Sequence, residues 1–253
     1  MNVMLMVAFL FLKTGEKFAT QEAAGPTVSN FTAYVAGKLD GVTFEPRVLN
    51  DPTKAVEFVT TKKPAVGIVS PGFHLAYAKQ LGMEALLETR RQTLPAERYV
   101  VDALKTASGD FQGKTIATTL AKEERYVSAV ILQGKFGDEV RLKAVSDVEG
   151  ALFDLVEGTK NAADAVLVEE AAWKAIEKDE ELGPKLKVVF TTDELPRDLV
   201  VLFRANVDGI DDGKLKAALK DADKQVLASI RVDAFVDVDQ ARLAKAQALF
   251  NGK

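Results

Sequence analysis

The stretch DFQGKTIATT, residues 110–119, decides the fold of this 253-residue chain. A Gly-Lys pair precedes a short β-branched strand, two threonines end it, and a helical pattern follows. At such strand-to-helix junctions, α/β proteins present backbone N–H groups and short hydroxyls to a ligand. The stretch therefore predicts an α/β lobe with a ligand-binding edge. If a second junction of this kind faces it from another lobe, the chain forms a cleft between two lobes.

Strands and helices alternate on both sides of this stretch. Before it we expect strands at 3–12, 43–49 and 64–70. We also expect three helices there: one at 28–39, one that begins at Pro52, and one that Ser70 and Pro71 cap and that runs to Leu81. After it we expect helices at 120–134, 147–158, 214–229 and 239–250, and strands at 140–145, 163–168 and 186–190. This alternation is typical of β-α-β units, and it predicts mainly parallel sheets flanked by helices.

Two extended segments, 98–104 and 191–199, join the two series, and we interpret them as hinge crossings. They predict a two-lobed α/β fold with a discontinuous first lobe. Lobe one would span 1–97 and 200–253, and lobe two would span 105–190. A hinge and cleft of this kind closes around a small ligand.

Composition excludes several classes of function. The formal net charge is −4 and the Lys and Arg residues form no stripe, so we expect no nucleic-acid partner. Cysteine is absent, which excludes disulfides and thiol chemistry. His74 is the single histidine, so a multi-histidine metal site or a Ser-His-Asp triad is not expected. No cofactor is expected either.

The N-terminal apolar run VMLMVAFLFL, residues 3–12, has two interpretations. It is shorter than the roughly 20 residues of a membrane-spanning helix. It fits the core of a signal peptide, although no positive charge precedes it. It also fits a fully buried first strand of a parallel sheet, which we favour.

Four segments in order carry a resemblance to a known family: 64–87, 110–119, 145–173 and 228–250. Together they resemble type 2 periplasmic solute-binding proteins, specifically the phosphate/phosphonate-binding components of ABC transporters. The resemblance implies the two-lobed periplasmic-binding-protein-like fold, with a buried strand opening the mature chain. It also implies export to the periplasm or cell envelope with the signal peptide removed, a permease partner, a small-molecule ligand, a monomeric state and no enzymatic activity.

The chain differs from the resembled family at two turns. Where those proteins carry a Gly-containing, Ser/Thr-rich loop around the ligand's oxyanion, residues 120–126 read LAKEERY. Where they carry a histidine before the 147–158 helix, this chain has Ser146 and Asp147. The ligand is therefore described as a small polar molecule, with phosphonate or another oxyanion as one candidate.

In lobe one, the candidate ligand-binding residues are Ser70, Pro71, Gly72 and Phe73. They end a strand and open a helix, whose free N–H groups and partial positive charge suit an anion or a carbonyl group. The same residues also fit a plain helix cap with proline in the first turn. His74 follows them, and we expect it to be partly buried and structural, or else to face the cleft.

In lobe two, the candidates are Thr118, Thr119, Tyr126, Ser146, Asp147 and Glu169. The threonines offer hydroxyls to an oxyanion or cap the next helix, and Tyr126 lies close enough to reach the cleft. Ser146 has capping-box spacing to Glu149, and Asp147 suits the helix dipole, so both also have structural interpretations. Glu169 ends a strand, where it would meet an amine on the ligand or simply begin a helix.

The sequence thus predicts a solute-binding protein that captures a small polar ligand for ABC-type import. Two alternatives stay open. One is a ligand-sensing module of the same fold that signals to a partner. The other is a small-molecule enzyme, which would need an acid and a base with perturbed pKa values in the cleft.

Overall fold

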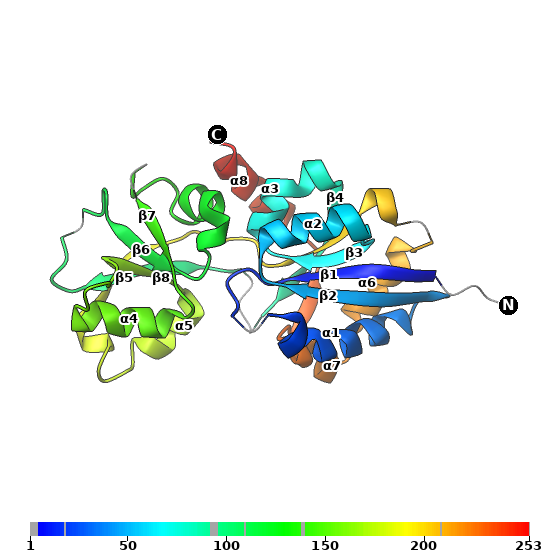
Figure 1. The fold of residues 1–253 in the computed structure, drawn as a ribbon, viewed down its shortest axis with the longest axis horizontal. Coiled ribbons are helices and arrows are strands. Elements are labelled where there is room, and N and C mark those ends of the chain that lie inside the picture. Colours follow the sequence, from blue (N-terminus) through cyan, green and yellow to red (C-terminus); the bar gives the residue numbers. More distant parts are fainter. Residues whose placement is uncertain are drawn as a thin grey trace. The chain divides into compact units, whose positions relative to one another are not determined.

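The computed structural model describes residues 5–17, 19–91, 96–108, 110–137, 140–207 and 209–252. The chain divides into two compact units, drawn in Figure 1. Unit 1 holds Met1–Ala96 and Pro196–Leu243, and unit 2 holds Glu97–Leu195 and Ala244–Lys253.

Among the described residues, the sheet of unit 1 has six strands in the order β11-β4-β10-β3-β1-β2. They are β1 (Leu5–Leu12), β2 (Val42–Leu49), β3 (Val66–Val69), β4 (Met83–Arg90), β10 (Leu199–Phe203) and β11 (Ala234–Val236). β1 pairs in parallel with β2 and β3, whereas β10 pairs antiparallel with β3 and β4, and β11 antiparallel with β4. β1 to β4 therefore run in one direction, and β10 is inserted between β3 and β4 in the opposite direction.

Helices cover both faces of this sheet (Figure 1). One face packs against α1 (Gln21–Ala36), α6 (Asp212–Lys220) and α7 (Lys224–Ser229). The other face packs against α2 (Pro52–Lys62), α3 (Pro71–Leu81) and the start of α8 (Gln240–Phe250). The single helix expected at 214–229 is two helices, because the chain turns between α6 and α7, where Asp223 caps α7.

The apolar run at the N-terminus forms β1 from Leu5 onward, which confirms the strand; residues 3 and 4 lie outside the described part. Full burial is wrong for its first two described residues, because Leu5 and Met6 are exposed, whereas the strand is largely buried from Val7 to Leu12. Phe9 and Phe11 lie in the core on the α1 side, and Leu10 lies in the core on the α2 side. The Phe9 ring meets Phe31 of α1 edge-on, with 6.4 Å between centroids. Because both faces are covered, the strand has no polar alternation.

Among its described residues, unit 2 has a five-stranded sheet in the order β7-β6-β8-β5-β9. Its strands are β5 (Tyr99–Leu104), β6 (Thr115–Thr118), β7 (Arg141–Ala144), β8 (Ala165–Glu169) and β9 (Leu186–Thr191). β6 pairs in parallel with β7 and β8, and β5 pairs antiparallel with β8 and β9. Helices α4 (Val148–Glu157) and α5 (Glu170–Ile176) pack Leu152, Leu155 and Trp173 into the core beside Val166 and Val168.

The expected α/β class with two sheets and flanking helices is confirmed, but the sheets are mixed rather than mainly parallel. Each contains a strand that runs against its neighbours, β10 in unit 1 and β5 in unit 2. The segment 98–104, expected as a hinge crossing, is mostly β5 and lies inside the unit 2 sheet. Of the segment 191–199, residue 191 ends β9 and residue 199 begins β10.

The helix expected at 120–134 is not a regular α-helix. A 3-10 turn at Ala121–Glu123 is followed by a π-helical turn at Tyr126–Ile131. The Leu132 N–H donates to the Val127 carbonyl oxygen at 2.8 Å, five residues back. This wider turn buries Val127, Val130 and Ile131, and such turns recur at functional sites.

Two structural features are absent from the described residues. None of the helices there has both the length and the apolar composition that crossing a membrane requires. No group of three or more histidine, aspartate or glutamate side chains in that part of the chain could hold a metal ion.

Candidate ligand-binding site

In unit 1, the ends of three adjacent strands lie at one edge of the sheet. β1 and β3 end there because they are parallel, and β10 begins there because Leu199 lies opposite Val69. We call this the unit 1 edge, and its polar residues are Lys13, Thr14, Ser70 and Asp198. It is the edge at which open α/β sheets bind ligands.

Ser70 is the N-cap of α3, as the sequence indicated. Its Oγ accepts a hydrogen bond from the Phe73 N–H at 3.3 Å and lies 3.4 Å from Thr14 Oγ1. Ser70 and Thr14 are both buried, at 6% and 7% exposed. Two hydroxyls from different strand ends are thus held side by side at the start of a helix.

The first turn of α3 has one unused donor among the described residues. Pro71 has no N–H, and the N–H groups of Phe73 and His74 bond to the Ser70 side chain and carbonyl oxygen. The Gly72 N–H is the one left over. The Phe73 side chain is not available to a ligand, because it is 1% exposed and packs 5.0 Å from the Tyr77 ring.

His74 lies in the same turn, and its burial agrees with the structural interpretation given to it from the sequence. It is 8% exposed, and its Nδ1 has no hydrogen-bond partner among the described residues. Burial lowers the His74 pKa to about 4, so the ring is neutral at physiological pH. A neutral imidazole offers one donor and one acceptor. Because buried polar atoms in proteins are nearly always bonded, the Nδ1 atom marks a place for a partner.

Lys13 and Asp198 form an ion pair at the unit 1 edge, with Nζ donating to Oδ2. The two side chains are 15% and 13% exposed, so the pair is largely shielded from water. The residues are 185 positions apart, which is why no local pattern predicts the pair.

In unit 2, the parallel strands β6, β7 and β8 end at one edge of their sheet. We call this the unit 2 edge, and its predicted site residues are Thr118, Thr119, Ser146, Asp147 and Glu169. The structure therefore brings five of the six candidates of this unit to the ends of adjacent strands, in the strand order β7-β6-β8.

The two threonines follow β6 with different exposure. Thr118 is 1% exposed, and its Oγ1 accepts a hydrogen bond from the Leu120 N–H at 3.1 Å. Thr119 is half-buried in the turn that follows. Thr118 therefore holds the turn, while Thr119 has the more accessible hydroxyl.

The capping box expected between Ser146 and Glu149 is not formed. Asp147 is the N-cap of α4, and its Oδ1 accepts a hydrogen bond from the Gly150 N–H at 2.6 Å. The helix begins one residue later than the box requires, because the carboxylate of Asp147 reaches the third helical N–H. Ser146 and Asp147 are both exposed, and Asp147 has the structural role that its alternative interpretation gave it.

Glu169 ends β8 opposite Tyr99 of β5 and occupies the N-cap position of α5. Its half-buried side chain makes no capping bond, and its carboxylate has no partner among the described residues. Tyr99 is fixed by a bond from its N–H to Thr192 Oγ1 at 2.9 Å. Glu169 therefore presents an unpaired carboxylate at the unit 2 edge.

Tyr126 opens the π-helical turn and is 3% exposed. Its ring is part of the interior of unit 2 and offers little surface to a ligand. The adjacent Arg125 donates from Nε to the Phe250 carbonyl oxygen at 3.0 Å and lies 4.8 Å from that ring.

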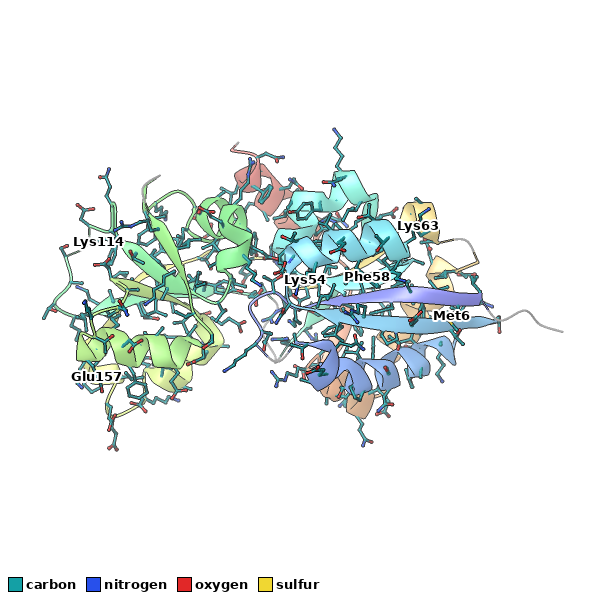
Figure 2. All side chains as sticks on the ribbon, viewed as in Figure 1. Met6, Lys54, Phe58, Lys63, Lys114 and Glu157 are labelled. Atoms are coloured by element: carbon teal, nitrogen blue, oxygen red, sulfur yellow. The ribbon has the colours of Figure 1, made fainter. Side chains whose placement is uncertain are left out.

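Unit 1 also has a hollow of about 800 Å³ between α2 and the strand pair β1–β2. Figure 2 labels three of its lining residues, Met6, Lys54 and Phe58, on β1 and α2. Met6 is 71% exposed, and the lining includes none of the candidate site residues. The hollow is therefore distinct from the unit 1 edge.

A family model described as the ABC transporter phosphonate periplasmic substrate-binding protein matches residues 19–243. No curated protein matches the chain. Among solved structures, the fold is similar to that of XAC2383 from Xanthomonas citri bound to chloride ion, with 12% identity over 98% of both chains and a TM-score of 0.72.

Two further solved structures are similar. One is PhnD1 from Prochlorococcus marinus in complex with methylphosphonate, with 12% identity over 98% of this chain and 97% of that chain and a TM-score of 0.65. The other is a binding protein component of an ABC phosphonate transporter, PA3383 from Pseudomonas aeruginosa, with 13% identity over 96% and 85% and a TM-score of 0.63. At these identities the structures share the fold.

Proposed function

The chain belongs to the periplasmic substrate-binding protein family of phosphonate ABC transporters, and from this premise we propose that its ligand is a small oxyanion of the phosphate or phosphonate class. The solute-binding role in ABC-type import comes with the family. The ligand class is our proposal, and so is the assignment of ligand contacts to individual residues.

The observation that carries the proposal is the first turn of α3. The unused Gly72 N–H and the unpartnered His74 Nδ1 lie within one helical turn, next to the buried hydroxyls of Ser70 and Thr14. A helix N-terminus favours negative charge and supplies N–H donors, so an oxyanion suits this position. The similar protein PhnD1 is in complex with methylphosphonate, which agrees with this chemistry.

In unit 2, we propose Thr119 as a hydrogen-bond donor to the oxyanion and Glu169 as an acceptor for the P–OH group of its singly protonated form, because a carboxylate repels a fully ionised oxyanion. The Thr119 hydroxyl is accessible and the Glu169 carboxylate is unpaired among the described residues. Thr118, Ser146 and Asp147 support these groups, because Thr118 and Asp147 already bond to neighbouring backbone N–H groups. Tyr126 supports the same region from the interior.

A thermal-shift screen tests the ligand class with phosphate, methylphosphonate, chloride, amino acids and polyamines. A ligand at 100 times its dissociation constant adds about 2.7 kcal/mol of apparent stability. We expect a shift with phosphate or methylphosphonate and none with polyamines. A shift with polyamines alone would contradict the oxyanion proposal, and no shift with any compound would contradict binding of this kind altogether.

Two matched cap variants test the site. Ser70→Ala removes the α3 cap, and Asp211→Ala removes the α6 cap, in which Asp211 Oδ1 accepts from the Lys214 N–H at 2.9 Å. Helix α6 follows the end of β10, at the opposite edge of the sheet from Ser70. Both variants lose a capping bond, but only Ser70→Ala should weaken ligand binding. Equal affinities in the two variants would remove the α3 turn from the site.

We further propose that the protein is exported to the periplasm, acts as a monomer with a membrane permease, and does not turn its ligand over. NMR of the bound ligand over hours checks for turnover, and light scattering checks the oligomeric state. Product formation would instead favour the enzyme alternative. Binding without any coupling to a permease in reconstituted transport would favour the sensing alternative.

A further inference from the structure

We propose that Lys13 is an internal counter-cation at the unit 1 edge and that it selects ligands by their charge. Ligands without an ammonium group are then preferred. Lys13 would act as a specificity-determining residue through its ion pair with Asp198. The proposal rests on the proposed function, because it requires a ligand at this edge.

Both residues of the pair are anchored through their backbones. The Lys13 N–H donates to the Leu49 carbonyl oxygen at 3.0 Å, and the Asp198 carbonyl oxygen accepts from the Thr89 N–H at 2.8 Å. The two side chains therefore start from fixed points on neighbouring parts of the sheet. An ion pair between anchored, largely buried side chains holds its geometry better than one on the surface.

The pair lies beside the α3 turn that the proposed ligand would occupy. Thr14, next to Lys13 in the chain, contacts Ser70 at 3.4 Å between hydroxyl oxygens, and Leu199, next to Asp198, lies opposite Val69. Lys13 also lines a hollow of about 200 Å³ in unit 1, together with Val28 of α1 and Ile230, so open space adjoins Lys13 on the α1 side of the sheet.

The charge of Asp198 decides what this position accepts. Alone, a shielded carboxylate would repel an oxyanion and attract an ammonium group. With Lys13 in place the pair is neutral overall, and an ammonium on the ligand would have to displace the Lys13 ammonium. By contrast, the exposed pair Lys214–Asp40, with side chains 54% and 91% exposed, is screened by water and has little influence on its surroundings.

A matched pair of probes isolates this effect. They are n-propylphosphonate, which ends in a methyl group, and 2-aminoethylphosphonate, which has an ammonium group in the same place. Calorimetry gives the ratio of their affinities. The wild-type protein should favour n-propylphosphonate. Lys13→Met keeps most of the side-chain volume but removes the charge, and it should shift the ratio towards 2-aminoethylphosphonate by about tenfold or more.

Further variants separate this role from a structural one. Asp198→Asn leaves the Lys13 charge without its carboxylate partner and should shift the ratio towards n-propylphosphonate. The Lys13→Met/Asp198→Asn double variant should return close to the wild-type ratio. Lys214→Met breaks an exposed ion pair of the same unit and should leave the ratio unchanged. A merely structural role would lower both affinities together and move no ratio.

The outcomes distinguish the two proposals. If the wild-type protein binds neither probe, the proposed phosphonate class fails and the inference fails with it. If it binds n-propylphosphonate but the ratio in Lys13→Met stays within about twofold of the wild-type ratio, only the inference is overturned. If Lys13→Met does not fold, Asp198→Asn decides: a ratio that stays unchanged, or that shifts towards 2-aminoethylphosphonate, overturns the inference.

Discussion

Each unit of this protein places a carboxylate inside its sheet, Glu88 on β4 in unit 1 and Asp102 on β5 in unit 2. Glu88 is 3% exposed, and its Oε1 accepts from the Arg197 N–H at 2.8 Å and from Arg242 Nη1 at 3.2 Å. Asp102 is 0% exposed, and neither of its carboxylate oxygens has a hydrogen-bond partner among the described residues.

The two carboxylates show two ways to bury an acid. Unit 1 compensates the charge of Glu88 with an arginine and backbone N–H groups. In unit 2, the pKa of Asp102 is raised to about 8. Burial is the larger cause, and the negative charge of Glu177 is the smaller one. Asp102 therefore holds a proton at neutral pH, because keeping the proton costs less than burying an unpaired charge.

The largest expected effect comes from Asp102. Its folded-state pKa is raised from an ordinary 3.8 to about 8, so the stability of unit 2 is greatest below pH 4 and falls as the pH rises through 8. The full difference is on the order of 5 kcal/mol. Asp102→Asn removes this dependence. Urea unfolding at pH 5 and pH 9, followed by the fluorescence of the single tryptophan, Trp173, measures it in unit 2.

Asp154→Asn is the matched control for that experiment, because Asp154 is an exposed carboxylate on α4 in the same unit. This control should keep the pH dependence of the wild-type protein. If Asp102→Asn and Asp154→Asn had the same pH profile, Asp102 would not be the protonated group.

Truncation of Glu88 should also have a large effect. Glu88→Ala removes the buried carboxylate that pairs with Arg242, which also pairs with the exposed Asp239, and it removes the acceptor of the Arg197 N–H. Breaking a buried pair of this kind costs about 3–5 kcal/mol. Glu84→Ala, on the same strand, breaks an exposed pair with Arg204 and should cost at most about 1 kcal/mol. Circular dichroism in urea compares the two. Similar costs would mean that the Glu88 network does not stabilise unit 1.

The sequence predicts the parts of this fold that depend on local pattern. The apolar run of β1 and the junctions at Ser70 and Thr118 are local, and the structure confirms the β1 strand and the strand-to-helix junction at Ser70. At Thr118 it confirms the end of the strand, but a 3-10 turn and a π-helical turn follow in place of the expected helix. The sequence does not predict β4, because MEALLETR consists mostly of good helix formers and becomes a strand through pairing with β10. The pairing partners are far away in sequence, so no local pattern reports them.

The candidate site follows the same division. Ser70 and Glu169 could be placed because each ends an apolar strand. The Lys13–Asp198 pair could not be predicted, since it depends on β10 being inserted beside β3. The orphan Nδ1 of His74 likewise depends on how the interior packs, which a single sequence does not show.

A pH dependence of the opposite sign is expected in unit 1. The folded-state pKa of His74 is lowered from an ordinary 6.5 to about 4, so stability is complete above pH 6.5 and is lost as the pH falls through 4. The full difference is about 3 kcal/mol. Between pH 4 and 6.5, acidification should weaken unit 1 while it strengthens unit 2. Hydrogen exchange of α3 peptides at pH 5 and 7, with His74→Gln as the variant that lacks the titration, measures this. Equal slopes in the two proteins would contradict it.

The smallest expected effect compares the helix caps at the two edges. Ser70 caps α3 from a buried position, and Asp147 caps α4 from an exposed one. Alanine at either position costs about 1 kcal/mol through the lost capping bond. The costs of the two substitutions should respond differently to salt. The carboxylate of Asp147 also interacts with the helix dipole, and 1 M salt screens that interaction. The cost of Asp147→Ala should therefore shrink in 1 M salt, while that of Ser70→Ala stays constant. A constant cost at both positions would show that Asp147 acts as a hydrogen-bond acceptor alone.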